Sequence, residues 1–126
     1  MSTVTLKEKL ENILNGLRAS NRIEMAAIIS RDGLIIATDS SQDHRKVKIR
    51  TFAALTATLN LSAETTIKRL SEKAPQSIIV ETPERYLIIR RASSDTFVVT
   101  LTTAKEELNE VLQEVKEAAE EVKELI

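Results

Sequence analysis

The 126-residue sequence contains no cysteine, which excludes disulfides, zinc–thiolate sites, iron–sulfur clusters and cysteine nucleophiles. Its two glycines, Gly16 and Gly33, lie too far apart to form the glycine-rich phosphate loops GxxxxGKS/T or GxGxxG. Aromatic residues make up only 2% of the chain, which excludes an aromatic platform for stacking nucleic-acid bases. No run of about 18 apolar residues is present, so no stable membrane insertion is expected. Residues 1–9 lack the apolar core of a secretion signal, and a cytoplasmic location is expected.

Charge is distributed unevenly along the chain. Residues 104–126 contain eight glutamates and three lysines, a net charge of −5, so the remainder carries +4 within a total of −1. This basic excess is too small to indicate binding to nucleic acid. The glutamates are expected to form the solvated face of a helix, with a docking strip for a basic partner as the alternative.

Three segments have apolar residues at the 3–4 spacing typical of amphipathic helices: residues 5–19, 44–73 and 104–126. Pro75 is expected to end the middle helix. One stripe of that helix is predicted to face the core, namely Phe52, Leu55, Leu59, Ala63, Ile67 and Leu70. A second face carries Ile49, Ala53, Ala57 and Leu61, and we expect it to meet another neighbour, which includes a second subunit.

Five short apolar segments are predicted to be strands: residues 23–30, 34–38, 77–82, 85–91 and 96–102. Asp32-Gly33 lies between the first two and predicts a tight hairpin, because glycine accepts a positive φ. The element order is therefore α-β-β-α-β-β-β-α. It predicts a single α+β domain over residues 1–126, with an antiparallel five-stranded sheet flanked by helices.

The sequence offers little for chemistry. Its one histidine, His44, is expected to be a solvated residue rather than a metal ligand. No catalytic, cofactor-binding or metal-binding residues are predicted, and the protein is not expected to be an enzyme. Four basic residues at the start of the middle helix oppose the helix dipole: Arg45, Lys46, Lys48 and Arg50. They are candidate contacts for an acidic partner surface, and the alternatives are ordinary surface charge and contact with an anionic lipid surface. Arg90 and Arg91 are interpreted as charges that guard a sheet edge.

Several runs resemble the roadblock (dynein light chain) domain: "MAAIISRDGLIIATD" (25–39), "FAALTATLNLSAE" (52–64), "SIIVETPERYLIIRR" (77–91) and "TFVVTLT" (96–102). The resemblance covers residues 6–112 and implies a profilin-like fold. It also implies a homodimer, or a heterodimer with a related roadblock protein, in which strand 77–82 pairs with its twin and the long helices lie side by side. The implied interface residues are Phe52, Ala53, Ala57, Leu61, Ser77, Ile78, Ile79, Val80 and Glu81.

Family members of this kind commonly bind Ras-like small GTPases. The resemblance therefore implies a non-catalytic homodimeric platform, without a cofactor, that binds and regulates or scaffolds such a GTPase. Two alternatives stay open: a ligand-binding profilin-like or PAS-like sensor, and a purely structural subunit of a larger complex. The role of the acidic helix over residues 104–126 is also open, because it could cover the sheet, recruit a partner, or do both.

Overall fold

A computed structural model of the chain describes residues 3–20, 22–39, 46–70, 72–103 and 107–126, and for residues 46–48 the backbone alone. The elements in chain order are α1 (Leu6–Arg18), β1 (Ile23–Ser30), β2 (Ile35–Thr38), α2 (Lys46–Lys68), β3 (Ser77–Glu81), β4 (Tyr86–Ser93), β5 (Thr96–Thr102) and α3 (Leu108–Leu125). The predicted order and the α+β class are confirmed.

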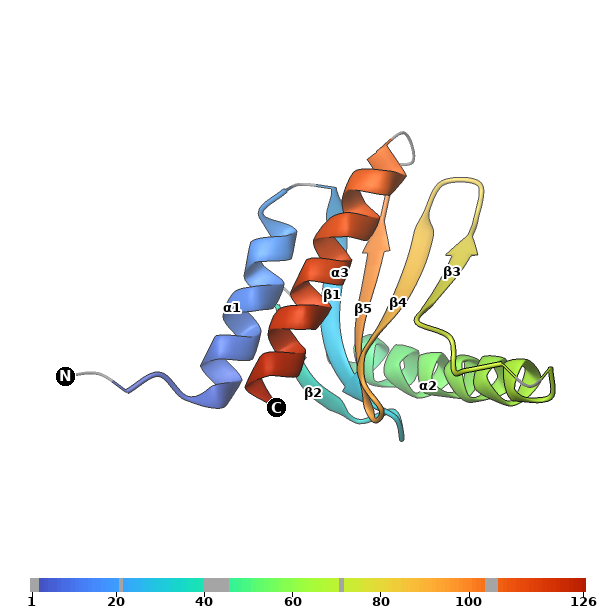
Figure 1. Cartoon of the computed structure of the whole chain (residues 1–126). Coiled ribbons are helices and arrows are strands. Elements are labelled where there is room, and N and C mark those ends of the chain that lie inside the picture. The colour runs from blue at the N-terminus through green and yellow to red at the C-terminus, as the bar shows by residue number, and fades with distance from the viewer. Residues whose placement is uncertain (1–2, 21, 40–45, 71, 104–106) are drawn as a thin grey trace.

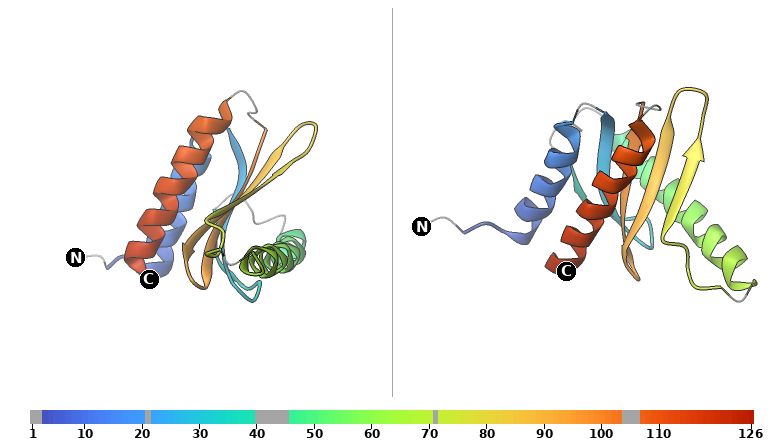
Figure 2. Two further views of the ribbon diagram at one scale, coloured as in Figure 1. Left: turned by 45° about the vertical axis from the view of Figure 1, so that its right-hand side comes forward. Right: turned by 45° about the horizontal axis from the view of Figure 1, so that its top comes forward.

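The five strands form one antiparallel sheet in the order β2-β1-β5-β4-β3. Helices cover both faces, so the chain has three layers. As Figures 1 and 2 show, α1 and α3 lie side by side on one face of the sheet, and α2 crosses the other face. The most apolar strands, β1 and β5, pair with each other near the centre of the sheet, while β2 and β3 form its two edges.

The core between the sheet and the α1–α3 layer is aliphatic. Leu10 and Leu14 of α1 and Val111, Val115 and Val122 of α3 are at most 2% exposed. The acidic helix therefore covers the sheet, which settles the first of the roles that the sequence left open. Its polar face points outward, as the 3–4 spacing of its valines requires.

Helix α1 begins at a threonine cap, Thr5. The backbone N–H of Glu8 donates to the Thr5 hydroxyl oxygen (3.1 Å), and that hydroxyl lies 3.2 Å from a carboxylate oxygen of Glu8. A threonine that accepts a bond from the third residue of the helix satisfies one of the unpaired N–H groups at the helix start.

The predicted orientation of α2 is wrong. The stripe expected to face the core is largely solvent-exposed: Leu55 is 66%, Leu59 38% and Leu70 68% exposed. The buried residues are instead Ile49, Ala53, Thr56, Ala57, Asn60 and Glu64. The reason lies in the β1–β2 hairpin, where a Cβ added to Gly33 would lie only 3.0 Å from the Ala54 Cα. Only small side chains fit where the helix approaches this closely.

Helix α2 also ends earlier than predicted, at Lys68 rather than at residue 73. Its C-terminal end reaches past β3, the last strand of the sheet (Figure 1), so the next turn would have no sheet to pack on. The backbone N–H of Leu70 donates to the Ile67 carbonyl (3.0 Å) in a tight final turn. The chain then returns toward β3.

Candidate protein–protein interface

The outer edge of β3 is the part of the sheet through which the resemblance implies dimer formation. The backbone N–H of Thr82 donates to the Arg85 carbonyl (2.8 Å), so the backbone polar groups of residue 82 point toward the β4 side. Along an antiparallel strand the backbone N–H and C=O groups of successive residues point alternately to one neighbour and to the other. The N–H and C=O of Ile79, three residues earlier, therefore point away from β4 and out of the sheet. The Ile79 side chain, at the centre of the strand, is 43% exposed. The strand thus presents backbone groups and apolar side chains to a second chain.

The two edges of the sheet differ. Strand β2 has four residues and a register shift opposite Ile28 and Ile29, which leaves Ile36 outside the pairing. Strand β3 has five residues in continuous register with β4. Short, bulged edges resist pairing with another chain, whereas regular apolar edges favour it. Of the two, β3 is the edge suited to a partner strand.

Helix α2, on the face of the sheet that it crosses, also has exposed apolar side chains. Leu55 (66% exposed) and Leu59 (38%) lie one turn apart on one flank, and Leu61 (52%) lies on the other. Phe52 is half-buried, whereas Ala53 and Ala57 are buried within the subunit against the β1–β2 hairpin. The structure therefore does not offer these two alanines to a second helix. It offers Leu55 and Leu59, which the sequence assigned to the core.

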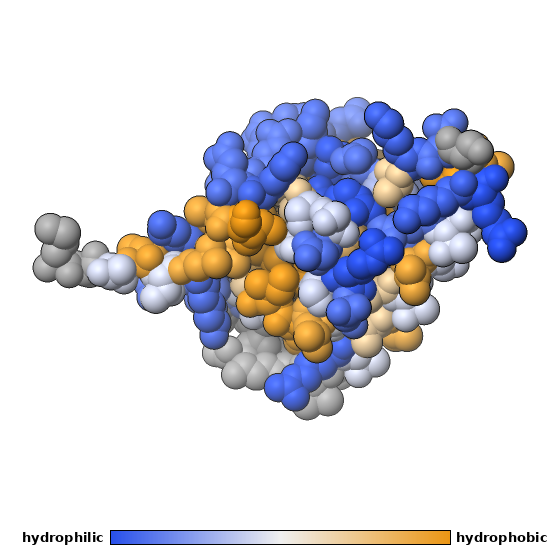
Figure 3. Space-filling view, turned by 60° about the horizontal axis from the view of Figure 1, so that its bottom comes forward, coloured by the Kyte–Doolittle hydropathy of each residue, from blue (hydrophilic) through white to orange (hydrophobic). Residues whose placement is uncertain are grey.

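A second set of exposed apolar residues gathers at the end of the molecule where α1 begins, β2 lies and α3 ends. They include Leu6 (48% exposed), Leu34 (69%) and Ile126 (52%). Figure 3, which views the molecule from below Figure 1, shows apolar side chains gathered on this face beside polar ones. This surface borders the bulged edge β2, which is the poorer of the two pairing edges.

A buried ion-pair cluster lies beneath the second half of α2. The Glu64 carboxylate forms an ion pair with the Arg91 guanidinium, and its other oxygen lies 2.7 Å from the Arg31 Nη2. Burial alone would raise the pKa of Glu64. The hydrogen bond from Arg91 and the charges of Arg91 and Arg31 outweigh it, so the pKa lies below its usual range. Arg91 was expected to guard an edge, but it lies on the inner strand β4 and points under α2.

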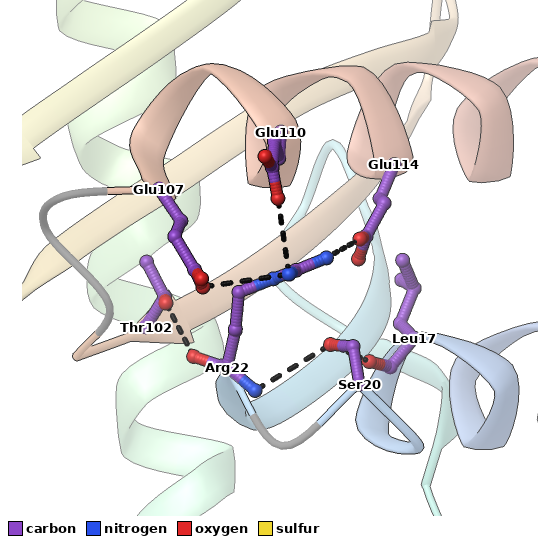
Figure 4. Close-up of polar contacts among 7 residues, drawn as sticks. All are labelled: Leu17, Ser20, Arg22, Thr102, Glu107, Glu110 and Glu114. Atoms are coloured by element: carbon purple, nitrogen blue, oxygen red, sulfur yellow. Dashed lines mark hydrogen bonds and ion pairs between the residues drawn. The ribbon is translucent and has the colours of Figure 1, made fainter.

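A second polar cluster joins α3 to the start of β1. The Arg22 guanidinium lies 3.4 Å from Glu107 and 3.1 Å from Glu110, and it forms an ion pair with Glu114 (Figure 4). The Glu114 hydrogen bond and the charges of all three carboxylates raise the pKa of Arg22. The Arg22 carbonyl also accepts a hydrogen bond from the Thr102 hydroxyl. The beginning of the acidic strip is thus engaged within the chain.

The remaining charged residues that the sequence singled out lie on α3 and at the start of α2. Four glutamates farther along α3 are exposed: Glu117, Glu120, Glu121 and Glu124. Of the basic cluster, Arg50 is exposed, Lys46 and Lys48 lie in the first turn of α2, and Arg45 lies outside the described residues, as does His44. Lys46, Lys48 and Arg50 therefore belong to one helix start, and of these only Arg50 has a described side chain.

The described part of the chain shows no grouping of three or more histidine, cysteine or acidic side chains suited to a metal ion. Among the same residues, every helix is either too short or too polar to cross a bilayer.

Solved structures with this fold are known. One is an MglB with a tetrameric arrangement, at 19% identity and a TM-score of 0.85, covering 99% of this chain and 93% of that one. Myxococcus xanthus MglB is similar at 17% identity and a TM-score of 0.85, covering 100% and 96% of the two chains. Profilin II of Acanthamoeba castellanii matches more loosely, at 16% identity and a TM-score of 0.63, over 95% and 98%. These likenesses establish a profilin-like fold.

No curated protein matches the chain in sequence. The sequence model of the Roadblock/LC7 domain, however, matches residues 9–102, which is most of the chain and spans from α1 to the end of β5. That family generally supplies regulatory or adaptor domains rather than catalytic ones. The chain belongs to the Roadblock/LC7 domain family.

Proposed function

We propose that the chain is a non-catalytic homodimeric platform that binds a Ras-like small GTPase and regulates or scaffolds it. The family membership supports an interaction role, and the similar structures named MglB and MglC are in keeping with it. The single observation that carries the dimer is the regular, apolar and outward-facing edge of β3.

The proposed dimer has a simple geometry. Two copies of β3 pair antiparallel about a two-fold axis, which makes the contact self-complementary and joins two sheets into one. Its strand residues are those the resemblance implied: Ser77, Ile78, Ile79, Val80 and Glu81. On α2, Phe52 and Leu61 remain in the proposed interface and Leu55 and Leu59 join them, because all four retain exposed surface.

The dimer is tested by mass. Light scattering on the wild-type chain at tens of micromolar is expected to give twice the mass of one chain. Ile79→Lys places a charge at the centre of the edge and should yield monomers at the same concentration. Leu34→Lys is the matched control, since it adds the same charge to an exposed apolar residue beside the other edge, and it should stay dimeric. A monomeric wild-type chain would contradict the proposal.

The GTPase role needs a functional assay. Candidate Ras-like GTPases from the same genome are mixed with the chain, and their nucleotide hydrolysis and exchange are followed. The expected result is a changed rate, or stable co-purification in the case of a scaffold. No change and no complex with any candidate would contradict this part of the proposal.

The basic start of α2 is proposed to contact an acidic surface of that partner. Arg50→Glu reverses an exposed charge there and should weaken the complex, more so at low salt. Arg69→Glu reverses an exposed charge just past the other end of α2 and serves as the control. If both variants bind the partner equally well, the basic start of α2 is not part of the partner-binding surface.

A further inference from the structure

The inward face of α2 changes character halfway along the helix. Its first half buries Ile49 and Ala53 against the sheet, where they join the apolar core around Phe97. Its second half buries the polar residues Asn60 and Glu64 at 3% and 1% exposure. The first half is therefore held by apolar packing on the sheet, and in the second half, where Ile67 is half-buried, polar contacts add to the packing.

Glu64 provides those contacts. Its carboxylate bonds to Arg91, whose side chain is 12% exposed, and to Arg31, whose side chain is 38% exposed. Asn60, one turn earlier, also acts on this carboxylate, because a side-chain hydrogen bond from Asn60 contributes to the lowered pKa of Glu64. The pair with Arg91 is the more enclosed of the two, so Arg91 is the principal anchor for this part of α2.

Arg91 also holds the chain that leads into β3. Its Nε donates to the carbonyl of Pro75 (3.2 Å), two residues before the strand begins, and its backbone N–H donates to the Gln76 carbonyl (2.9 Å). Its Nη1 reaches the Ser94 carbonyl in the β4–β5 hairpin (3.2 Å). The guanidinium carbon lies 5.0 Å from the centre of the Phe97 ring, which completes its enclosure. One side chain thus bonds to both α2 and the start of β3.

We propose that Glu64 and Arg91 form a positioning pair that sets α2 relative to the β3 edge, and thereby sets the affinity of the dimer. This inference rests on the proposed homodimer, whose two surfaces are the exposed leucines of α2 and the edge of β3. A buried ion pair contributes little net stability compared with an apolar pair of similar volume, and its best-supported role is to fix one geometry. Here the geometry fixed is the one that a second subunit meets.

The test separates positioning from stability by removing both charges together. The double variant Glu64→Met, Arg91→Met fills the space with apolar side chains. It leaves Arg31, which reaches solvent, without its carboxylate partner, and it leaves the Pro75 and Ser94 carbonyls without the Arg91 donor. Its unfolding midpoint in urea is expected to stay near that of the wild type. Its dimer dissociation constant, from sedimentation or fluorescence dilution of fully folded protein, should rise roughly three- to thirtyfold, the range typical of residues acting through packed neighbours.

Single variants support this comparison. Arg91→Lys keeps the charge beside Glu64, but one ammonium cannot replace the guanidinium bonds to α2, Pro75 and Ser94 together, so the dissociation constant should rise while the fold is kept. Glu24→Gln is the matched control, because it breaks the exposed ion pair with Arg85 (2.8 Å), away from α2, and should leave dimer affinity unchanged.

The outcomes are distinct. A dimeric wild type with the expected loss in the double variant and in Arg91→Lys supports the positioning pair. A dimeric wild type whose affinity is the same in both variants overturns it and leaves the proposed dimer intact. A wild-type chain that is monomeric at tens of micromolar overturns the proposed dimer and this inference with it.

Discussion

Replacing Gly33 by alanine tests how the β1–β2 hairpin meets α2. Gly33 has a φ of +88°, and its N–H donates to the Ser30 carbonyl (3.0 Å) to close the turn. An added Cβ would lie 3.0 Å from the Ala54 Cα and 3.3 Å from the Ala57 Cβ. The new methyl group therefore meets backbone that cannot rotate away, as well as an unfavourable φ.

Two costs combine in this variant. A left-handed conformation costs a residue with a Cβ about 1–2 kcal/mol. Overpacking an ordered site costs typically about 1–3 kcal/mol. The free energy of unfolding should thus fall by roughly 2–5 kcal/mol, a large part of the 5–15 kcal/mol typical of a domain. For a chain of this size the melting temperature should fall by roughly 8–20 °C.

The assay is thermal and urea unfolding followed by circular dichroism, with the other glycine as the control. Gly16 lies in α1, and a Cβ added there would meet nothing within 4 Å. Gly16→Ala should raise the free energy of unfolding by about 0.5–1 kcal/mol, because alanine has the higher helix propensity. Opposite signs for the two glycines are expected. A Gly33→Ala protein as stable as the wild type would refute the close approach of hairpin and helix.

Three further changes have defined outcomes. The pKa of Glu64 is lowered from 4.5, so its ion pairs stabilise the fold above that pH and are lost as the pH falls through the folded pKa. In urea unfolding, the Glu64→Gln variant should therefore lose less stability on acidification than the wild type does. Val115→Ala should lower the free energy of unfolding by roughly 1–3 kcal/mol, whereas exposed Lys116→Ala should stay within about 0.5 kcal/mol; equal effects would contradict the placement of α3 on the sheet. Asp39 is 2% exposed and accepts a bond from the Ala26 N–H (3.1 Å), so Asp39→Ala should cost about 1–3 kcal/mol in the same assay, and a neutral result would contradict that bond.

Most elements of the fold could be predicted from local patterns in the sequence. The short apolar segments predicted β1 and β5 with their observed bounds, and the turn at Asp32-Gly33 lies where the sequence predicted it. Each of these features depends on residues that are close in the chain, so pattern and propensity suffice to predict it.

The orientation of α2 could not be predicted in the same way. Hydrophobicity favours the stripe of Leu55 and Leu59, but the space beneath the helix is set by the hairpin at Gly33, which is distant in sequence. A signal for the true inward face was present, since Ala53, Ala57, Asn60 and Glu64 continue at steps of 3 and 4. Its polar half is hard to recognise as buried unless its partners are known.

The ion pair between Glu64 and Arg91 could not be predicted from the sequence. Arg91 lies 27 residues farther along the chain, on a strand that the sequence could not place inside the sheet. Strand order decides whether such an arginine guards an edge or reaches under a helix. That order depends on pairings between strands far apart in the chain, which single-sequence patterns do not specify.

The central claim is that β3 of one chain pairs with β3 of another, and amide hydrogen exchange at Ile79 tests it most directly. The Ile79 N–H points away from β4, and among the described residues of one subunit no strand pairs with that side of β3. In the proposed dimer this amide lies at the centre of the strand pair and should exchange slowly at tens of micromolar, then lose its protection on dilution. Fast exchange of Ile79 at every concentration, beside a protected amide at Ile78, would contradict the pairing.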